Sequence, residues 1–105
     1  MSEEDENIIE LEQKNQGNYA VSFDPIDGSS NIDANISIGS IFSIWKRISD
    51  PTDCANNEDI LQNGRNIIAA GYCLYAASTQ FVLATSNEVN VYNLDPMLGE
   101  FVLTN

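Results

Sequence analysis

Large and small side chains alternate after the N-terminal segment of the chain. Apolar residues recur at every second position from Tyr19 through Val21 to Phe23, and small residues lie between them. This period of two is typical of a β-strand with one heavily packed face. The pattern changes at Asp24, where the polar octapeptide of residues 24–31 begins. The strand is therefore predicted to end at this octapeptide.

The middle of the chain combines a strand pattern with a polar loop. The strand pattern resumes over residues 36–45, and its phase slips at Gly39-Ser40, which predicts a β-bulge there. Residues 49–64 contain a proline, several asparagines and several acids. This composition predicts a loop with room for one short helix over residues 57–61.

The last third of the chain is dominated by apolar residues. Residues 66–85 are almost all apolar or small, which predicts two strands or one long bent strand buried on both faces. A helix over residues 67–77 is the alternative. Turn residues bound two more apolar runs, over 89–94 and 100–104, so the end of the chain is predicted to be a β-meander. No amphipathic stretch of helical length accompanies these strands, so the chain looks incomplete.

Charge narrows the possible partners. The 105 residues carry a net charge of −12 and only four basic side chains, which argues against nucleic acid or an anionic membrane as a partner. Many of the acids crowd residues 1–18, where we expect a short extended piece followed by a loop. Most of these acids are expected to be solvated; they are Glu3, Glu4, Asp5, Glu6, Glu10 and Glu12.

No charged and apolar leader or long apolar span is present in the sequence, so a soluble, cytoplasmic protein is expected. The two cysteines have unlike surroundings, because Cys54 lies in a polar stretch and Cys73 in an apolar one. Such a pair makes neither a disulfide framework nor a metal site, and we expect two free thiols.

The octapeptide has the composition of a cation site. Pro25 suits the second position of a four-residue turn, which is expected to place Asp24 and Asp27 side by side. Two carboxylates this close repel each other unless a cation lies between them, and Mg²⁺ prefers such oxygen ligands.

The second half of the octapeptide has the composition of a phosphate site. Gly28 allows a group to approach the backbone closely, and Ser29 or Ser30 is predicted to cap a short helix. The unpaired N–H groups at a helix start attract phosphate. The alternative reading is an ordinary surface turn followed by a helix cap, with no ligand.

Several segments together make the chain resemble class I fructose-1,6-bisphosphatase, within the lithium-sensitive phosphatase superfamily. The similarity covers nearly the whole chain, and its most specific part is the continuation Ser-Ser-Asn-Ile-Asp after the Asp-Pro-x-Asp-Gly core. The matching segments are Tyr19 to Asn35, Gly39-Ser40-Ile41-Phe42, Gly64-Arg65-Asn66, Ala69-Ala70-Gly71-Tyr72, Leu94-Asp95-Pro96 and Gly99-Glu100-Phe101.

The resemblance implies an α/β layered sugar phosphatase fold, of which this chain is a fragment dominated by mixed or antiparallel strands with short helices. It implies hydrolysis of the 1-phosphate of fructose 1,6-bisphosphate with Mg²⁺ or Mn²⁺. Carried over by position, the metal ligands are Glu3, Asp24, the carbonyl of Ile26 and Asp27, while Glu4 helps to activate water. The segment Asp27, Gly28, Ser29 and Ser30 contacts the scissile phosphate.

The resemblance also implies what lies outside the chain. Residues 1–105 match the central part of an N-terminal metal-binding domain, and the upstream helices and the downstream sugar-binding domain are missing. The parent protein is expected to be a cytoplasmic homo-oligomer, a dimer or tetramer, with a plastid location as the alternative. Two other functions stay open, namely a non-catalytic module that binds cations or phosphate, and a sedoheptulose or inositol phosphatase of the same superfamily.

Overall fold

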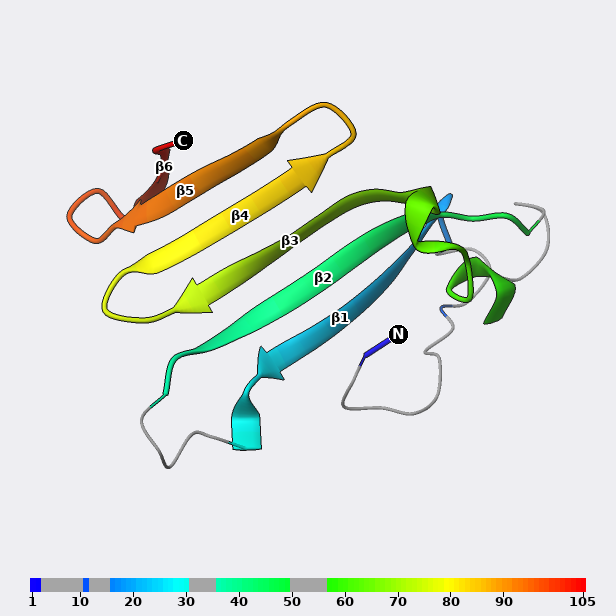
Figure 1. Cartoon of the computed structure of the whole chain (residues 1–105), viewed down its shortest axis with the longest axis horizontal. Coiled ribbons are helices and arrows are strands. Elements are labelled where there is room, and N and C mark those ends of the chain that lie inside the picture. Colours follow the sequence, from blue (N-terminus) through cyan, green and yellow to red (C-terminus); the bar gives the residue numbers. More distant parts are fainter. Residues whose placement is uncertain (3–10, 12–15, 31–35, 50–56) are drawn as a thin grey trace.

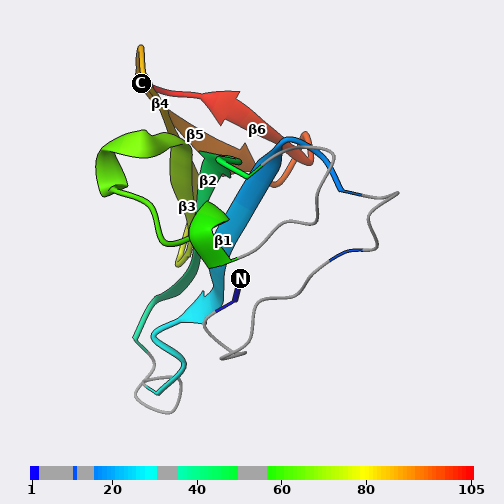
Figure 2. The same ribbon diagram turned by 90° about the vertical axis from the view of Figure 1, so that its right-hand side faces the viewer.

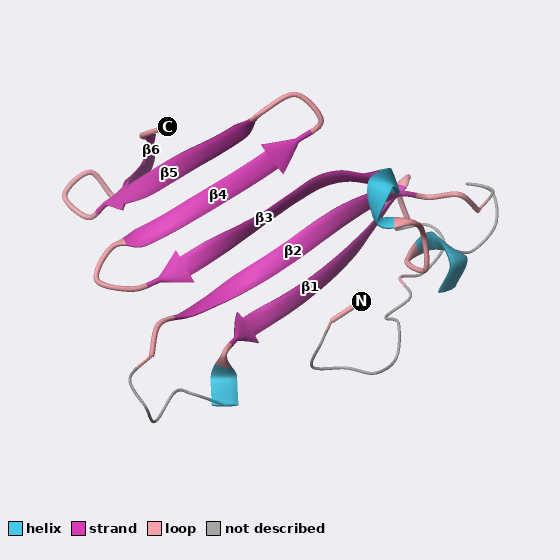
Figure 3. Ribbon diagram, in the orientation of Figure 1, coloured by secondary structure: helices cyan, strands magenta, loops and turns pink. Residues whose placement is uncertain are grey.

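The computed structural model of the chain describes residues 1–2, 11, 16–30, 36–49 and 57–105. These residues form one six-stranded sheet in which the strands follow the order of the sequence and every neighbouring pair is antiparallel (Figure 1). Two short 3-10 helices lie between the second and third strands (Figure 3). The elements are β1 Tyr19–Asp27, β2 Ile38–Lys46, η3 Asn57–Asp59, η4 Gly64–Asn66, β3 Ile67–Tyr75, β4 Thr79–Thr85, β5 Val89–Asp95 and β6 Glu100–Leu103.

This arrangement confirms most of the predicted elements. The β-dominated fold class is confirmed, and the predicted meander extends over the whole sheet. Residues 67–85 form two strands, β3 and β4, rather than the alternative helix. The helix expected within the loop is η3, and within the described ranges no helix has the length and apolar content needed to cross a membrane.

The prediction of heavily packed strand faces is wrong for the described part of the chain. Tyr19, Val21 and Phe23 of β1 retain 61%, 42% and 40% of their accessible surface. In β3, Ile68 and Tyr72 are also exposed, although this segment was expected to be buried on both faces. The reason is that the described residues build a single twisted layer (Figure 2), so most side chains touch only their neighbours in the sheet.

An aromatic cluster spans the sheet from β2 to β6. The ring of Phe81 lies 6.2 Å from Phe42, 6.0 Å from Tyr92 and 6.0 Å from Phe101, measured between centroids. Gly71 of β3 lies between Phe42 of β2 and Val82 of β4. A Cβ at this position would be 2.8 Å from the Phe42 ring and 2.3 Å from the carbonyl oxygen of Val82, so only glycine fits without a shift of its neighbours.

A buried polar cluster fixes the end of β2. Asp59 of η3 is 1% exposed and accepts hydrogen bonds from the backbone N–H groups of Ile48 and Ser49, at 2.9 and 3.0 Å. The guanidinium of Arg47 lies 3.8 Å from the Asp59 carboxylate and donates to the carbonyl of Gly17 at 3.1 Å. This cluster therefore ties η3 and the segment before β1 to the same strand end.

The cysteine prediction is confirmed where the structure describes it. Cys73 lies in β3 as a free thiol, whereas Cys54 lies outside the described residues.

Candidate metal and phosphate site

The Asp-Pro-Ile-Asp segment forms a β-bulge rather than a turn. Strand β1 continues to Asp27, and its register against β2 runs from Asp24 opposite Ile41 to Asp27 opposite Gly39. Three steps along β1 therefore match two steps along β2, so β1 contains the extra residue. The predicted turn is wrong, and the predicted bulge lies in β1 rather than at Gly39 of β2.

The bulge places both acids of the motif on one face of the sheet. In a regular strand, residues three apart point to opposite faces. Here Asp24 and Asp27 pair with Ile41 and Gly39, which are two apart and therefore share a face. Their backbones are separated by roughly the 7 Å of two strand residues. The two carboxylates can therefore bind one ligand. The sequence also predicts this, but from a turn rather than from a bulge.

Local hydrogen bonds hold the bulge. The backbone N–H of Ile26 donates to Oδ1 of Asp24 at 3.2 Å, and the hydroxyl of Ser40 donates to the carbonyl oxygen of Pro25. Asp24 still has its second carboxylate oxygen and further lone pairs for a cation. One acid thus shapes the backbone and remains available as a ligand.

The strand ends at Gly28, whose φ of +87° lies in the left-handed region that favours glycine. Ser29 and Ser30 already belong to a 3-10 turn and are exposed, so neither serine precedes the helical turn as a cap. Residues 31–35 lie outside the described residues. The described part of the expected phosphate site is therefore the half-buried Gly28 followed by the exposed Ser29 and Ser30, just after the end of β1.

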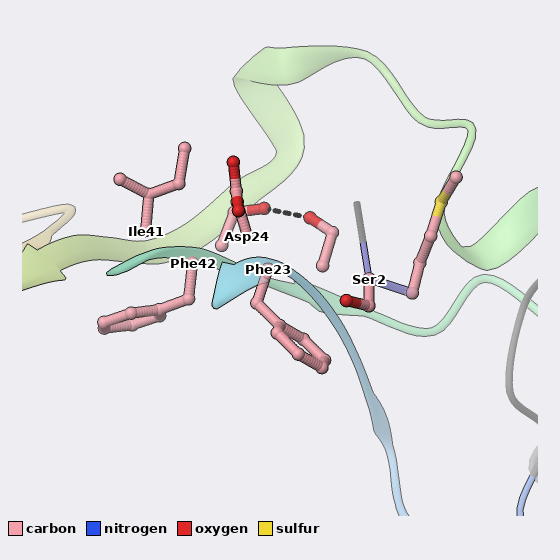
Figure 4. A pocket seen from close by; sticks show the side chains of 8 residues that line it. Ser2, Phe23, Asp24, Ile41 and Phe42 are labelled. Carbon is pink, nitrogen blue, oxygen red and sulfur yellow. Dashed lines mark hydrogen bonds between the residues drawn. The ribbon is translucent and has the colours of Figure 1, made fainter. Parts of the chain in front are cut away.

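An open hollow of about 450 Å³ lies beside Asp24. Figure 4 shows Asp24 and Ile41 pointing to one side of the sheet, and Phe23 and Phe42 pointing to the other. The hollow is lined by the first two residues of the chain and by residues of β1 and β2. These residues are Met1, Ser2, Ser22, Phe23, Asp24, Ile41, Phe42 and Ser43.

The first two residues of the chain lie along the free edge of β1. The ammonium group of Met1 donates to the carbonyl of Val21 at 2.7 Å, and the N–H of Phe23 donates to the carbonyl of Met1 at 2.9 Å. Ser2 forms a parallel bridge with Phe23 and is 7% exposed. Ser2 precedes Glu3 in the chain, just as Phe23 precedes Asp24.

A hydrogen-bonded group next to the hollow had no signal in the sequence. The hydroxyls of Ser22 and Ser43 bond to each other across β1 and β2. The indole N–H of Trp45 donates to Ser43 at 3.1 Å and to Ser22 at 3.3 Å. Trp45 is 8% exposed, so this group stiffens β1, which carries Asp24 and Asp27, against its neighbour β2.

The described residues bring together several oxygen donors of the expected metal site. Among them, no group of three or more His, Cys, Asp or Glu side chains is close enough to hold an ion. Asp24, Asp27 and the carbonyl of Ile26 are hard oxygen donors at one bulge, which fits the ligand preference of Mg²⁺. Glu3 and Glu4, the other two predicted acids, lie outside the described residues.

Comparisons with known proteins agree over the whole chain. The sequence model of the family described as "Fructose-1-6-bisphosphatase, N-terminal domain" matches residues 1–105. The chain is 54% identical over 103 residues to Fructose-1,6-bisphosphatase 1 of Bos taurus, covering 98% of this chain and 30% of that relative. It is 53% identical over 104 residues to the cytosolic fructose-1,6-bisphosphatase of Oryza coarctata, covering 99% and 30%.

The cytosolic fructose-1,6-bisphosphatase of Spinacia oleracea is 51% identical over 104 residues, again covering 99% of this chain and 30% of the relative. The chain thus spans about a third of the length of the curated relatives it matches. On the match of the family model to every residue, the chain belongs to the fructose-1,6-bisphosphatase family, within its N-terminal domain.

Proposed function

We propose that the protein containing these residues hydrolyses the 1-phosphate of fructose 1,6-bisphosphate to give fructose 6-phosphate, a step of gluconeogenesis. The family match over residues 1–105 carries the proposal, because the relatives are named as fructose-1,6-bisphosphatases. The bulge supports it independently, since its register puts Asp24 and Asp27 on one face of the sheet, next to Gly28 and the exposed Ser29 and Ser30.

In this proposal the carboxylates of Asp24 and Asp27 and the carbonyl of Ile26 would hold two Mg²⁺ or Mn²⁺ ions, with Asp24 as the ligand that the ions share. Bound divalent ions would neutralise the phosphate charge and lower the pKa of water. Asp24 suits the role of a ligand because the bond from the Ile26 N–H is made to Oδ1, which leaves the second carboxylate oxygen available for a cation.

Two N-terminal acids complete the proposed carboxylate set. Glu3 is the further metal ligand and Glu4 helps to activate the attacking water. Ser2, the residue before Glu3, forms a parallel bridge with Phe23, the residue before Asp24, and this bridge supports the assignment.

The scissile phosphate is proposed to lie against Asp27 to Ser30. Gly28 has no side chain to obstruct the approach of an oxygen, and the Ser29 and Ser30 side chains are exposed donors. Phosphoryl transfer depends mainly on positioning and charge neutralisation. Adjacent carboxylates for cations and hydroxyls for phosphate supply both requirements.

The remaining properties follow the relatives. A cytoplasmic location is proposed because the Oryza and Spinacia relatives are named cytosolic, with a plastid location as the alternative. The partner is a sugar bisphosphate, and a net charge of −12 disfavours nucleic acid or an anionic membrane. The parent is proposed to be a homo-oligomer, a dimer or tetramer.

The experiment measures phosphate release by the longest natural protein that contains this sequence, supplied with fructose 1,6-bisphosphate and Mg²⁺. Asp27→Asn is expected to lower kcat/KM by at least about 100-fold, because it removes one charged metal ligand. Glu88→Gln is the matched control, since Glu88 is an exposed acid in the β4–β5 turn. Full activity of Asp27→Asn would contradict the proposed phosphatase site. Binding of Mn²⁺ without turnover of any sugar or inositol phosphate would favour a non-catalytic module.

A further inference from the structure

Pro25 creates a gap in the pairing of β1 with β2. Proline has no backbone N–H to donate, so it is confined in sheets to edges and bulges. Pro25 lies in edge strand β1, between the pairs Asp24–Ile41 and Asp27–Gly39. Ser40 of β2 therefore lies opposite both Pro25 and Ile26. The regular backbone pairing is interrupted there, and this interruption determines on which face of the sheet Asp27 lies.

Two hydroxyls from neighbouring strands fill this gap. Ser40 Oγ donates to the carbonyl oxygen of Pro25, and the phenolic oxygen of Tyr75 lies 3.0 Å from Ser40 Oγ. A serine hydroxyl has one proton to give. Because that proton goes to Pro25, Tyr75 is the donor to Ser40. The order is therefore Tyr75 O–H to Ser40 O–H to Pro25 C=O, a chain in which each bond strengthens the next.

The close approach of β2 and β3 brings Tyr75 within reach. Tyr75 pairs with Ile38, two residues from Ser40 and on the same face of the sheet. At Gly39, between them, a Cβ would lie only 2.7 Å from the carbonyl oxygen of Cys73. The hydroxyl chain thus links three consecutive strands at a point where β2 and β3 lie close together.

We propose that Ser40 and Tyr75 are positioning residues of the metal site. They hold the bulge in the one register that puts both carboxylates on the same face, since a slip by one residue would turn Asp27 to the other face. Neither hydroxyl touches a proposed metal ligand side chain, so both act through the Pro25 carbonyl. The role in metal binding rests on the proposed function, whereas the hold on the bulge does not.

The test uses the longest natural protein that contains this chain, with Mn²⁺ alone as the calorimetric probe and sugar bisphosphate hydrolysis as a second readout. Tyr75→Phe removes only the phenolic oxygen, and Ser40→Ala removes the hydroxyl that it supports. Each is expected to weaken Mn²⁺ binding roughly 2- to 10-fold, the factor for one lost hydrogen bond, and to lower kcat more than it changes KM.

Three comparisons separate positioning from a general loss of stability. Ser40→Thr keeps a hydroxyl and is expected to restore Mn²⁺ affinity to within about twofold. Tyr72→Phe, at an exposed tyrosine of the same strand, is expected to leave it unchanged. In the double variant, Tyr75→Phe should add nothing to Ser40→Ala, because the effect of Tyr75 passes through Ser40.

Amide hydrogen exchange tests the hold on the bulge even if the protein binds no metal. Amide hydrogen exchange at Ile26 and Asp27 is expected to be faster in Tyr75→Phe than in the parent, and unchanged at Val91 of β5. Unaltered exchange at the bulge overturns the inference whatever the metal result. If the parent binds Mn²⁺ and hydrolyses the sugar bisphosphate, an Mn²⁺ affinity of the variants equal to that of the parent overturns the positioning role alone. A parent that does neither overturns the proposed function instead.

Discussion

Removing the Asp59 carboxylate should destabilise the protein more than any surface change. Asp59 is 1% exposed and accepts from Ile48 N–H at 2.9 Å, Ser49 N–H at 3.0 Å and the Ser49 hydroxyl at 2.7 Å. Its substitution by alanine leaves two backbone donors without this acceptor and removes the carboxylate beside Arg47, itself 8% exposed. Breaking such a buried pair costs about 3–5 kcal/mol.

The assay is thermal and chemical unfolding of the longest natural protein that contains the chain, with Asp59→Ala beside the exposed control Glu88→Gln. The expected loss for Asp59→Ala is about 3–5 kcal/mol, and the expected loss for Glu88→Gln is within about 0.5 kcal/mol. Asp59→Asn should fall between them, because one amide oxygen can still accept the backbone N–H groups. Equal stability of Asp59→Ala and Glu88→Gln would refute the view that this cluster ties η3 to β2.

Two further changes test the packing of the sheet. Gly71→Ala should destabilise the protein by about 1–3 kcal/mol because its Cβ would meet the carbonyl of Val82 at 2.3 Å. Gly17→Ala, with nothing within 4 Å of its Cβ, is the control, and equal unfolding midpoints would contradict the clash. Trp45→Phe keeps an aromatic ring but loses the donor to Ser43, and should cost about 1 kcal/mol on denaturant titration. A denaturation midpoint identical to the parent's would show that the indole bond contributes nothing.

The meander at the end of the chain could be predicted because local residues determine it. Turn residues at Asn87 and at Asp95-Pro96 separate short apolar runs, and antiparallel neighbours joined by tight turns give a meander. Asp95 shows the local chemistry directly, since its carboxylate accepts from the N–H groups of Met97 and Leu98 at 2.9 and 3.2 Å. Such signals lie within a few residues and need no knowledge of the rest of the fold.

The position of the bulge could not be predicted, because register is a property of two strands. The break in the apolar alternation at Gly39-Ser40 lies opposite the bulge, but it did not show that the extra residue belongs to β1. The contact between Ser40 and Tyr75 joins residues 35 apart in the sequence, and no local pattern predicts it. The exposure of Tyr19 likewise depends on what covers the sheet, which the spacing of apolar residues in one strand does not specify.

The candidate acids illustrate both cases. Composition and spacing identified Asp24 and Asp27, but the expected turn was replaced by a bulge that brings them to one face by another route. The resemblance to the bisphosphatases identified Glu3, which composition alone treats as a solvated acid.

The most direct test of the account is a calorimetric Mn²⁺ titration of the longest natural protein that contains the chain, with Asp24→Asn, Asp27→Asn and the double variant. The bulge predicts that each single change weakens binding at least about 10-fold. The double change should be far from additive, because both carboxylates serve one site. Parent-like affinity in both single variants, or full additivity in the double variant, would contradict a shared metal site at this bulge.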